Sequence, residues 1–283
     1  VATMTAPSVA SRLPDLDLKE HPPLPPLARN NILLILTDDQ DQMLGGGFDP
    51  EDLTSPTPMP RTRALLANKG MTARNWFAHS PICCPSRAQL LTGRYLHNLR
   101  INQSNSPQYP MENADCMHVD VSKVHGRSFA VALQAAGFRT GLFGKYLNKW
   151  PFLHVPEEFE SFLGTGGGHY ITPRFVASGM GWYGVDDGWW SAPTGSYSTS
   201  VIGNATAAWI SRVARQEEEH RRRPWFAMMA PKAPHEPFMP APWHADVWST
   251  TWPEHEPRPL AYNATAIERG PRHGNLRTQR PLS

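Results

Sequence analysis

The stretch ILLILTDDQD, residues 32–41, indicates the fold class of this chain. Its first five residues form a continuous apolar run of strand length, which is typical of a strand buried on both faces of a parallel sheet. Acidic residues follow at once, beginning with Asp38 and Asp39. Because open α/β sheets bind ligands at the carboxyl ends of their strands, we expect these carboxylates to lie at a ligand crevice. The pair suits a metal ion, whereas a single Asp would be explained equally well by a turn or a helix cap.

Predicted helices and strands alternate along the rest of the chain. The helices are expected at 61–68, 128–136 and 200–220, and the strands at 71–77, 138–143 and 225–230. This alternation predicts an α/β fold with a mainly parallel sheet flanked by helices. Residues 164–196 are dense in Gly, Trp, Tyr and Pro. We expect them to form an irregular excursion that either shapes the mouth of a site or packs as an aromatic loop.

Length and composition limit the domain organisation. The 283 residues suffice for one large domain with a sizeable core. We expect a Pro-rich, extended segment at 1–29, one domain at 30–240 and an irregular tail at 241–283. The formal charge is +2, with no basic stripe interleaved with aromatic residues, so a nucleic-acid partner is not expected. No apolar run approaches the length of a membrane span, and no membrane partner is expected either.

Two features suggest the secretory pathway. Asn-x-Ser/Thr sequons at Asn102, Asn204 and Asn263 are typical of a glycoprotein. If Cys83 is consumed by a modification, the other two cysteines, Cys84 and Cys116, could pair in an oxidising compartment. The chain begins with Val and has no apolar signal segment, so we expect that its N-terminus has been processed or lost. An extracellular or lysosome-like location is the expectation.

The run CCPSRAQLLTG, residues 83–93, has the strongest chemical signal. Pro85 suits the first turn of a helix that continues to Leu91. Cys83 would then lie at the positive end of the helix dipole, where an oxyanion is favoured, and Arg87 could reach back from about one turn further on. Adjacent cysteines could also be disulfide partners or zinc ligands. No further C-x-x-C or His pair at ligand spacing accompanies them, which argues against a zinc site.

Two basic residues follow predicted strands and belong to the same edge of the sheet. Lys145 is a mobile point charge that suits an oxyanion, although most lysines are simply solvated. His235 lies between Pro234 and Pro237, which would hold it rigidly. A rigid imidazole suits a proton donor near neutral pH, although an ordinary loop histidine is the alternative.

Four motifs together resemble a known family. LTDDQD at 36–41, CCPSR at 83–87, FGKYLN at 143–148 and APHEPF at 233–238 are similar, in order and spacing, to the N-terminal part of a type I, formylglycine-dependent sulfatase. The nearest branch contains N-acetylglucosamine-6-sulfatases and fungal arylsulfatases. The resemblance implies an alkaline-phosphatase-like fold, truncated at the C-terminus, one Ca²⁺ ion, and hydrolysis of sulfate monoesters of a sugar or aryl alcohol. A formylglycine-generating enzyme is then an implied partner.

The resemblance also implies the roles of individual residues. Cys83, oxidised to an aldehyde and hydrated, presents two hydroxyls on one carbon, so one can attack sulfur and the other can then expel sulfate. Carried over residue by residue, the family pattern makes Asp38 and Asp39 calcium ligands, and Cys83 both a calcium ligand and the nucleophile. It makes Arg87 the group that stabilises the aldehyde hydrate. Lys145 is then the group that binds sulfate, and His235 is the group that contacts the sulfate or the leaving oxygen.

The chain departs from the family pattern in two ways. Many arylsulfatases have His where this chain has Leu147, although the glucosamine-sulfatase branch also reads KYLN. The family's second half, with an Asp-Asn pair of the calcium site and a second lysine, is not in these 283 residues. A catalytically inactive fragment that acts as a glycoprotein or binding module is therefore the alternative hypothesis. A phosphomonoesterase or phosphodiesterase of the same superfold is a third, but those enzymes usually place Ser or Thr with zinc at the nucleophile position.

Overall fold

The computed structural model describes residues 30–40, 59–73, 76–100, 119–148, 150, 154–219 and 223–245. The chain divides into two units, Val1–Asn30 and Asn31–Ser283, and the elements below all belong to the second. Several sequence predictions lie outside the described residues: the extended segment at 1–29, the tail beyond 245, the sequons at Asn102 and Asn263, and Cys116. No helix in the described ranges is both long and apolar enough to cross a membrane.

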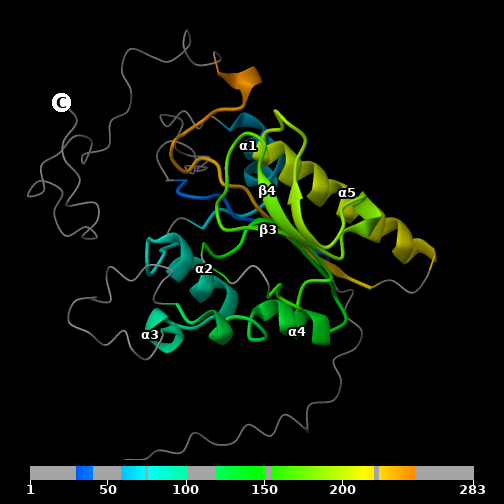
Figure 1. Ribbon diagram of the computed structural model, residues 1–283. Coiled ribbons are helices and arrows are strands. Elements are labelled where there is room, and N and C mark those ends of the chain that lie inside the picture. The colour runs from blue at the N-terminus through cyan, green and yellow to red at the C-terminus, as the bar shows by residue number, and fades with distance from the viewer. Residues whose placement is uncertain are drawn as a thin grey trace, which may run out of the picture. The chain divides into compact units, whose positions relative to one another are not determined.

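A six-stranded sheet forms the centre of the second unit (Figure 1). In spatial order its strands are β1 (Ile32–Ile35), β6 (Trp225–Ala230), β2 (Arg139–Lys145), β3 (Ser161–Thr165), β4 (Arg174–Ser178) and β5 (Gly188–Ser191). The pairings from β1 through β6 and β2 to β3 are parallel. Those of β4 with β3 and with β5 are antiparallel. The expected α/β sheet is confirmed, as a mixed sheet whose parallel part contains the strands that precede the predicted site.

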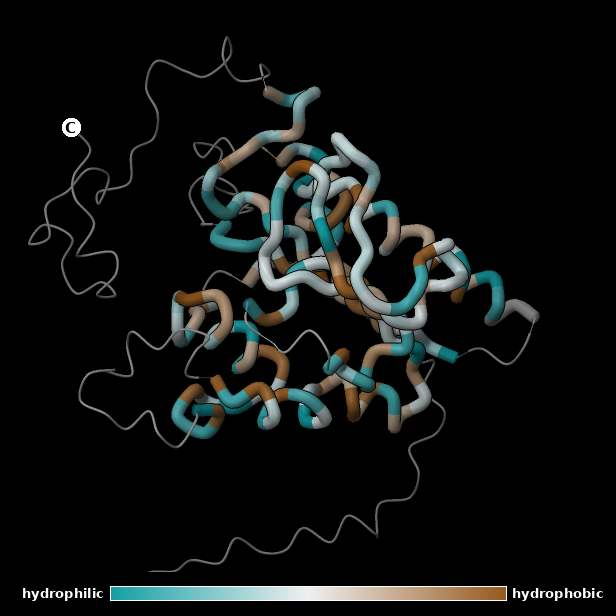
Figure 2. The backbone as a smooth tube through the Cα atoms, viewed as in Figure 1, coloured by the Kyte–Doolittle hydropathy of each residue, from teal (hydrophilic) through white to brown (hydrophobic). Residues whose placement is uncertain are grey.

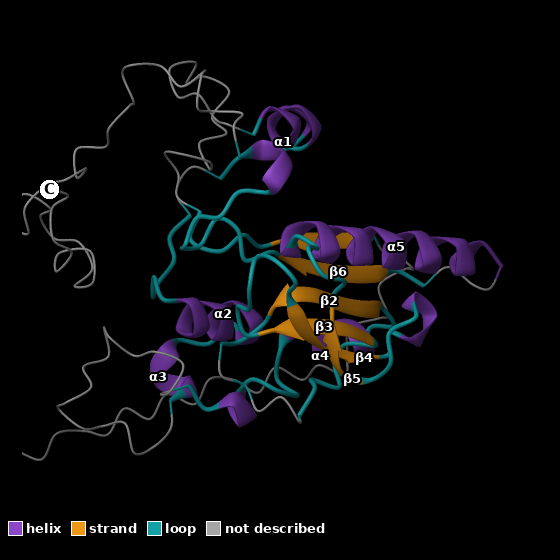
Figure 3. Ribbon diagram, turned by 45° about the horizontal axis from the view of Figure 1, so that its top comes forward, coloured by secondary structure: helices purple, strands orange, loops and turns teal. Residues whose placement is uncertain are grey.

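Helices cover both faces of this sheet. They are α1 (Pro60–Leu65), η2 (Ala67–Lys69), α2 (Cys83–Thr92), α3 (Leu96–Leu99), η6 (Val121–Lys123), α4 (Phe129–Ala135), η7 (Gly181–Tyr183), α5 (Ser198–Glu219) and η8 (Pro242–His244). Figure 3 shows the long α5 lying along the sheet. The helices predicted at 61–68, 128–136 and 200–220 are confirmed as α1 with η2, α4 and α5.

Alternating side chains of the strands build two hydrophobic clusters. Leu142 and Phe162 pack in a cluster with residues of α2, α3 and α4, whereas their neighbours Phe143 and Leu163 pack in a second cluster with α5. Successive strand residues point to opposite faces, so this division places one helical layer on each side of the sheet. Figure 2 shows hydrophobic segments along the strands at the centre.

The first strand is less buried than the sequence suggested. β1 lies at the edge of the sheet, and Ile32, Leu33 and Ile35 are 40%, 45% and 45% exposed. The prediction of a strand buried on both faces is therefore wrong for the described structure. The apolar run correctly indicates a strand. The burial of its side chains depends on which elements lie beside it, and in the described part of the chain β1 pairs with β6 alone.

Two further predictions need correction. The strand predicted at 71–77 is wrong, because 71–73 and 76–78 have no regular structure, and Met71, Trp76 and Phe77 are 93%, 81% and 84% exposed. The irregular excursion predicted at 164–196 is also wrong in part. Three of its aromatic residues belong to β4 and β5, where Phe175 pairs with Trp190 and Val176 with Trp189. Aromatic and β-branched residues favour such cross-strand pairs, and the glycines between them form the turns.

Candidate active site

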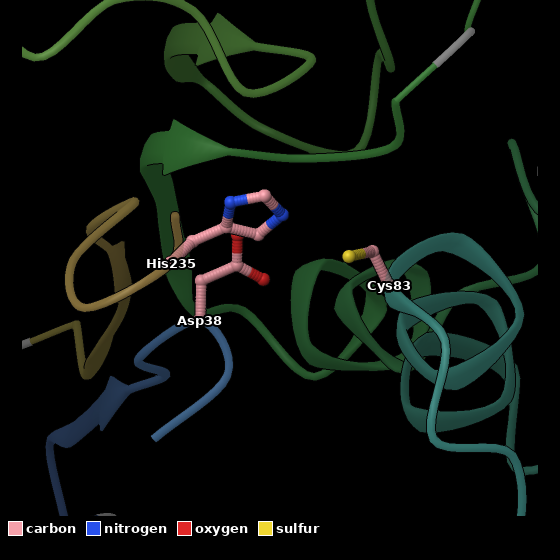
Figure 4. A group of neighbouring side chains, drawn as sticks. All are labelled: Asp38, Cys83 and His235. Atoms are coloured by element: carbon pink, nitrogen blue, oxygen red, sulfur yellow. The ribbon is translucent and has the colours of Figure 1, made fainter. Parts of the chain in front are cut away.

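The predicted site residues come from the carboxyl ends of three neighbouring parallel strands. Asp38 follows β1, Lys145 is the last residue of β2, and His235 follows β6. These strands are adjacent in the order β1-β6-β2, so the chain emerges from all three at one edge of the sheet. The N-terminus of α2, with Cys83, faces the same edge. Figure 4 shows the Cys83 side chain directed from α2 toward Asp38 and His235.

Asp38 is a buried carboxylate that pairs with two cations. It is 3% exposed, and its Oδ1 accepts a hydrogen bond of 3.1 Å from Nη2 of Arg87. Its Oδ2 accepts one from Nζ of Lys145, which is 1% exposed. Arg87 also donates from Nη1 to the backbone oxygen of Lys145 at 2.9 Å. Two cations thus share one carboxylate, which leaves a net positive charge suited to an anion such as a sulfate ester.

The local backbone at the end of β2 explains the position of Lys145. Gly144 has φ +112°, which L side chains rarely adopt, and a Cβ there would lie 2.1 Å from the backbone oxygen of Ala230. Only glycine therefore lets β2 approach β6 this closely. The approach directs the next side chain, Lys145, into the edge where Asp38 lies.

His235 lies opposite Asp39 with a defined orientation of its ring. Its Nδ1 is 2.7 Å from the backbone oxygen of Glu236, which can only accept, so Nδ1 carries the hydrogen. The other nitrogen, Nε2, is then the one that faces the site, at 3.5 Å from Oδ2 of Asp39. Asp39 has φ +58°, in the left-handed region that Asp tolerates better than most residues, and its side chain is 53% exposed.

Cys83 occupies the first turn of α2. The helix spans Cys83–Thr92 and ends at Gly93 in the left-handed conformation, so the helix predicted from Pro85 to Leu91 is confirmed. Cys83 is partly buried and free, whereas Cys84 is disulfide-bonded. The ligand atoms of Asp38, Cys83 and His235 lie within 4.8 Å of one another, a group that could hold a metal ion. All six predicted site residues thus meet at one place.

The prediction from sequence missed Tyr170. This residue precedes β4 and is 3% exposed, and its hydroxyl donates to the backbone oxygen of His235. Burial, the neighbouring Tyr197 and the carboxylates of Asp38 and Asp39 raise the pKa of Tyr170 to about 12. Nothing in the local sequence signals this contact, because the two residues are 65 positions apart.

Comparison with known proteins agrees with this geometry. The family model described as Sulfatase matches residues 30–264. The chain belongs to the sulfatase family. It is 32% identical over 235 residues to the extracellular sulfatase SULF-1 homolog of Drosophila melanogaster, covering 81% of this chain and 18% of that protein. It is 30% identical over 229 residues to the human N-acetylglucosamine-6-sulfatase, covering 76% of this chain and 36% of that enzyme.

Solved structures of sulfatases have the same fold. BT4656, in complex with its substrate D-glucosamine-2-N,6-O-disulfate, superposes with a TM-score of 0.54 and 23% identity, covering 83% of this chain and 40% of that one. The alkaline-phosphatase-like sulfatase fold predicted from the motifs is therefore confirmed. The chain spans well under half the length of these relatives, so it corresponds to an N-terminal part of them.

Proposed function

We propose that this sulfatase-family chain forms the nucleophile-bearing part of an enzyme that hydrolyses sulfate monoesters through a formylglycine made from Cys83. The observation that carries the proposal is the position of Cys83 at the N-terminus of α2, with its sulfur within 4.8 Å of ligand atoms of Asp38 and His235. The two buried cations Arg87 and Lys145 lie beside it, on Asp38. A nucleophile, a cationic pocket and an acid–base group are the parts that sulfate transfer requires.

The reaction needs each of these residues in turn. One hydroxyl of the hydrated aldehyde at position 83 gives its proton to water and attacks sulfur, and the bond from sulfur to the alcohol oxygen breaks. His235, when both of its ring nitrogens are protonated, gives the leaving oxygen the proton on Nε2, the nitrogen that faces the site, and keeps the hydrogen on Nδ1. The second hydroxyl then gives its proton to the vacated Nε2 of His235, the carbon–oxygen bond to sulfate breaks, and the aldehyde is restored and hydrated again by water. Lys145 and Arg87 stabilise the negative charge on the sulfate oxygens.

The residues present fit a calcium ion in chemistry, but they supply only part of its ligands. Calcium takes about six to eight oxygen ligands. Asp38 and Asp39 would hold it, and conversion of Cys83 would replace a sulfur, a poor calcium ligand, by oxygen. Each oxygen of Asp38 bound by Arg87 or Lys145 retains a second lone pair for the ion. A bound ion would add positive charge against the entering sulfate.

The substrate we propose is a sulfated amino sugar, with a sulfated aryl alcohol as the second candidate. Sequence similarity to an N-acetylglucosamine-6-sulfatase and fold similarity to a protein bound to glucosamine disulfate support the sugar. Similarity to arylsulfatases, at 25% identity to that of Volvox carteri, supports the alternative. A similar protein described as extracellular supports a secretory location, where the formylglycine-generating enzyme would act on the nascent chain.

The test is to produce the full product of this gene together with a formylglycine-generating enzyme. Peptide mass spectrometry should find the aldehyde at Cys83, and the protein should release sulfate from 6-O-sulfated glucosamine faster than from a chromogenic aryl sulfate. The Cys83→Ala variant should release none. Sulfate release that survives in Cys83→Ala would disprove the mechanism. Conversion without any release, from either substrate, would favour the inactive glycoprotein or binding module instead.

A further inference from the structure

The turn that carries His235 is held by side chains from another part of the fold. The hydroxyl of Tyr170 donates to the backbone oxygen of His235. Within the turn, the backbone nitrogen of His235 donates to Lys232 at 3.0 Å, and that of Phe238 donates to His235 at 3.2 Å. The oxygen of His235 therefore accepts from both a local and a distant donor. Its peptide group cannot rotate without breaking both bonds.

A second tyrosine extends this anchor along the turn. Tyr197 stacks on Tyr170 with ring centroids 5.9 Å apart and an interplanar angle of 17°. Its hydroxyl donates to the backbone oxygen of Met239 at 3.0 Å. Tyr170 and Tyr197 also form a small hydrophobic cluster with Ala241, against which Ala233 packs. The pair thus binds the turn on both sides of His235.

Lys232 makes a further contact with Tyr170. Its Nζ donates to the backbone oxygen of Gly168 at 3.0 Å and lies 4.9 Å from the centroid of the Tyr170 ring. A cation over an aromatic face is attractive, and here it also links the start of the turn to the segment that carries Tyr170. Tyr170 therefore contacts both the ring of Tyr197 and the ammonium group of Lys232.

The consequence for the imidazole follows from its own hydrogen bond. Nδ1 of His235 donates to the oxygen of Glu236, the next residue, so the direction of that peptide decides which ring nitrogen faces the cleft. Tyr170 restrains the adjoining peptide. Because burial, first of all, raises the pKa of Tyr170 to about 12, its hydroxyl remains a donor throughout the neutral range.

We propose that Tyr170 is a positioning residue: through the backbone of His235 it holds the turn so that Nε2 of that imidazole faces Cys83 and Asp38. This inference rests on the proposed function of His235 as the proton donor. It assigns to Tyr170 a role in orientation, with no contact to substrate or to the reacting atoms.

The test uses Tyr170→Phe, with Tyr183→Phe as the matched control. Tyr183 lies on η7 and packs on Trp182, in a different cluster. Nitrogen NMR at one fixed pH reports which imidazole nitrogen carries the hydrogen, and His235→Gln assigns the signal. In Tyr170→Phe we expect the Nδ1 signal of His235 to move away from the position given by its hydrogen bond to Glu236, while Tyr183→Phe leaves it unchanged. In the full gene product we expect kcat to fall about tenfold or more in Tyr170→Phe, with KM nearly unchanged.

Superposable His235 signals in Tyr170→Phe and the unsubstituted protein would overturn the inference. This readout needs no sulfatase activity, so a protein that releases no sulfate refutes the proposed function and still decides the role of Tyr170. If Tyr170→Phe fails to fold, Lys232→Met removes the ammonium above the ring and its bond to Gly168. The same shift of the His235 signals is then expected, and unchanged signals would contradict the proposal.

Discussion

At the residue scale, the site depends on one buried carboxylate. Asp38 neutralises only one of the two cations that it touches, and Arg87 and Lys145 are themselves 4% and 1% exposed. Removal of one partner from a buried ion pair leaves an uncompensated charge in a poorly hydrated place, which costs more than the pair contributes. Asp38 is thus expected to stabilise the fold as well as to influence any anion or metal that binds here.

We therefore expect Asp38→Asn to lower the free energy of unfolding by about 3–5 kcal/mol. Its neighbour provides the matched control, because the Asp39 side chain is 53% exposed and Asp39→Asn should cost no more than about 1 kcal/mol. Urea denaturation of both variants measures the difference. Equal losses would show that the buried ion pairs do not stabilise the fold.

A second residue, His125, predicts how stability depends on pH. Burial lowers the pKa of His125 below 6.5; His154 lowers this pKa as well, whereas Glu158 raises it. Among the described residues, Nε2 of His125 is buried without a hydrogen-bond partner. The folded protein therefore holds this proton less tightly than the unfolded chain does. Stability should fall as the pH drops below about 6.5, through the folded-state pKa. In His125→Gln the urea midpoint should fall less between pH 7.5 and 5.5, whereas His244→Gln, at an exposed position, should keep the full dependence.

At the scale of elements, the contact between β2 and β6 positions the end of each strand. Gly144 of β2 pairs with Ala230 of β6 and allows the close contact. The residues that follow these two, Lys145 after Gly144 and the turn with His235 after Ala230, belong to the candidate site. A one-residue change of register would turn Lys145 to the other face of the sheet. The close approach of the two backbones thus links strand pairing to the orientation of a predicted sulfate-binding group.

Gly144→Ala should therefore destabilise the protein by about 2 kcal/mol or more, because the new Cβ would meet backbone at an unfavourable φ. Gly203 in α5 offers a control of opposite sign. A Cβ there would lie 3.6 Å from the methyl group of Met229, an ordinary contact, so Gly203→Ala should be neutral or stabilise by up to about 1 kcal/mol. Thermal unfolding of both variants tests the pair, and equal effects would contradict this reading of the β2–β6 contact.

At the scale of the whole molecule, β1 is an edge strand with exposed apolar side chains. Three of its four residues are exposed, and parallel strands are normally covered on both faces. An edge strand that pairs on one side only, as β1 does among the described residues, is a template for pairing with other chains. The part of the sheet beside Asp38 thus depends on what lies against β1.

We expect the 283-residue chain, produced alone, to self-associate and to release negligible sulfate even with the aldehyde confirmed at Cys83. Leu33→Lys should reduce the association, because a charge on an edge strand discourages pairing, whereas Arg212→Lys on α5 should not. Light scattering on a sizing column measures the association. A monomeric chain with Cys83-dependent sulfate release would show that β1 needs no cover and that ligands within these residues complete the site.

Sequence alone determined several of the elements and the residue chemistry. Pro85 indicates the first turn of α2, an apolar run marks β6 at 225–230, and the motifs identify the family, because these signals are local. Tertiary structure decided what depends on distant partners. It placed Lys145 on Asp38, 107 residues away, put β1 at an edge, left 71–73 and 76–78 without a strand, and brought Tyr170 to His235. Burial and pairing are properties of two surfaces that meet, so one stretch of sequence cannot specify them.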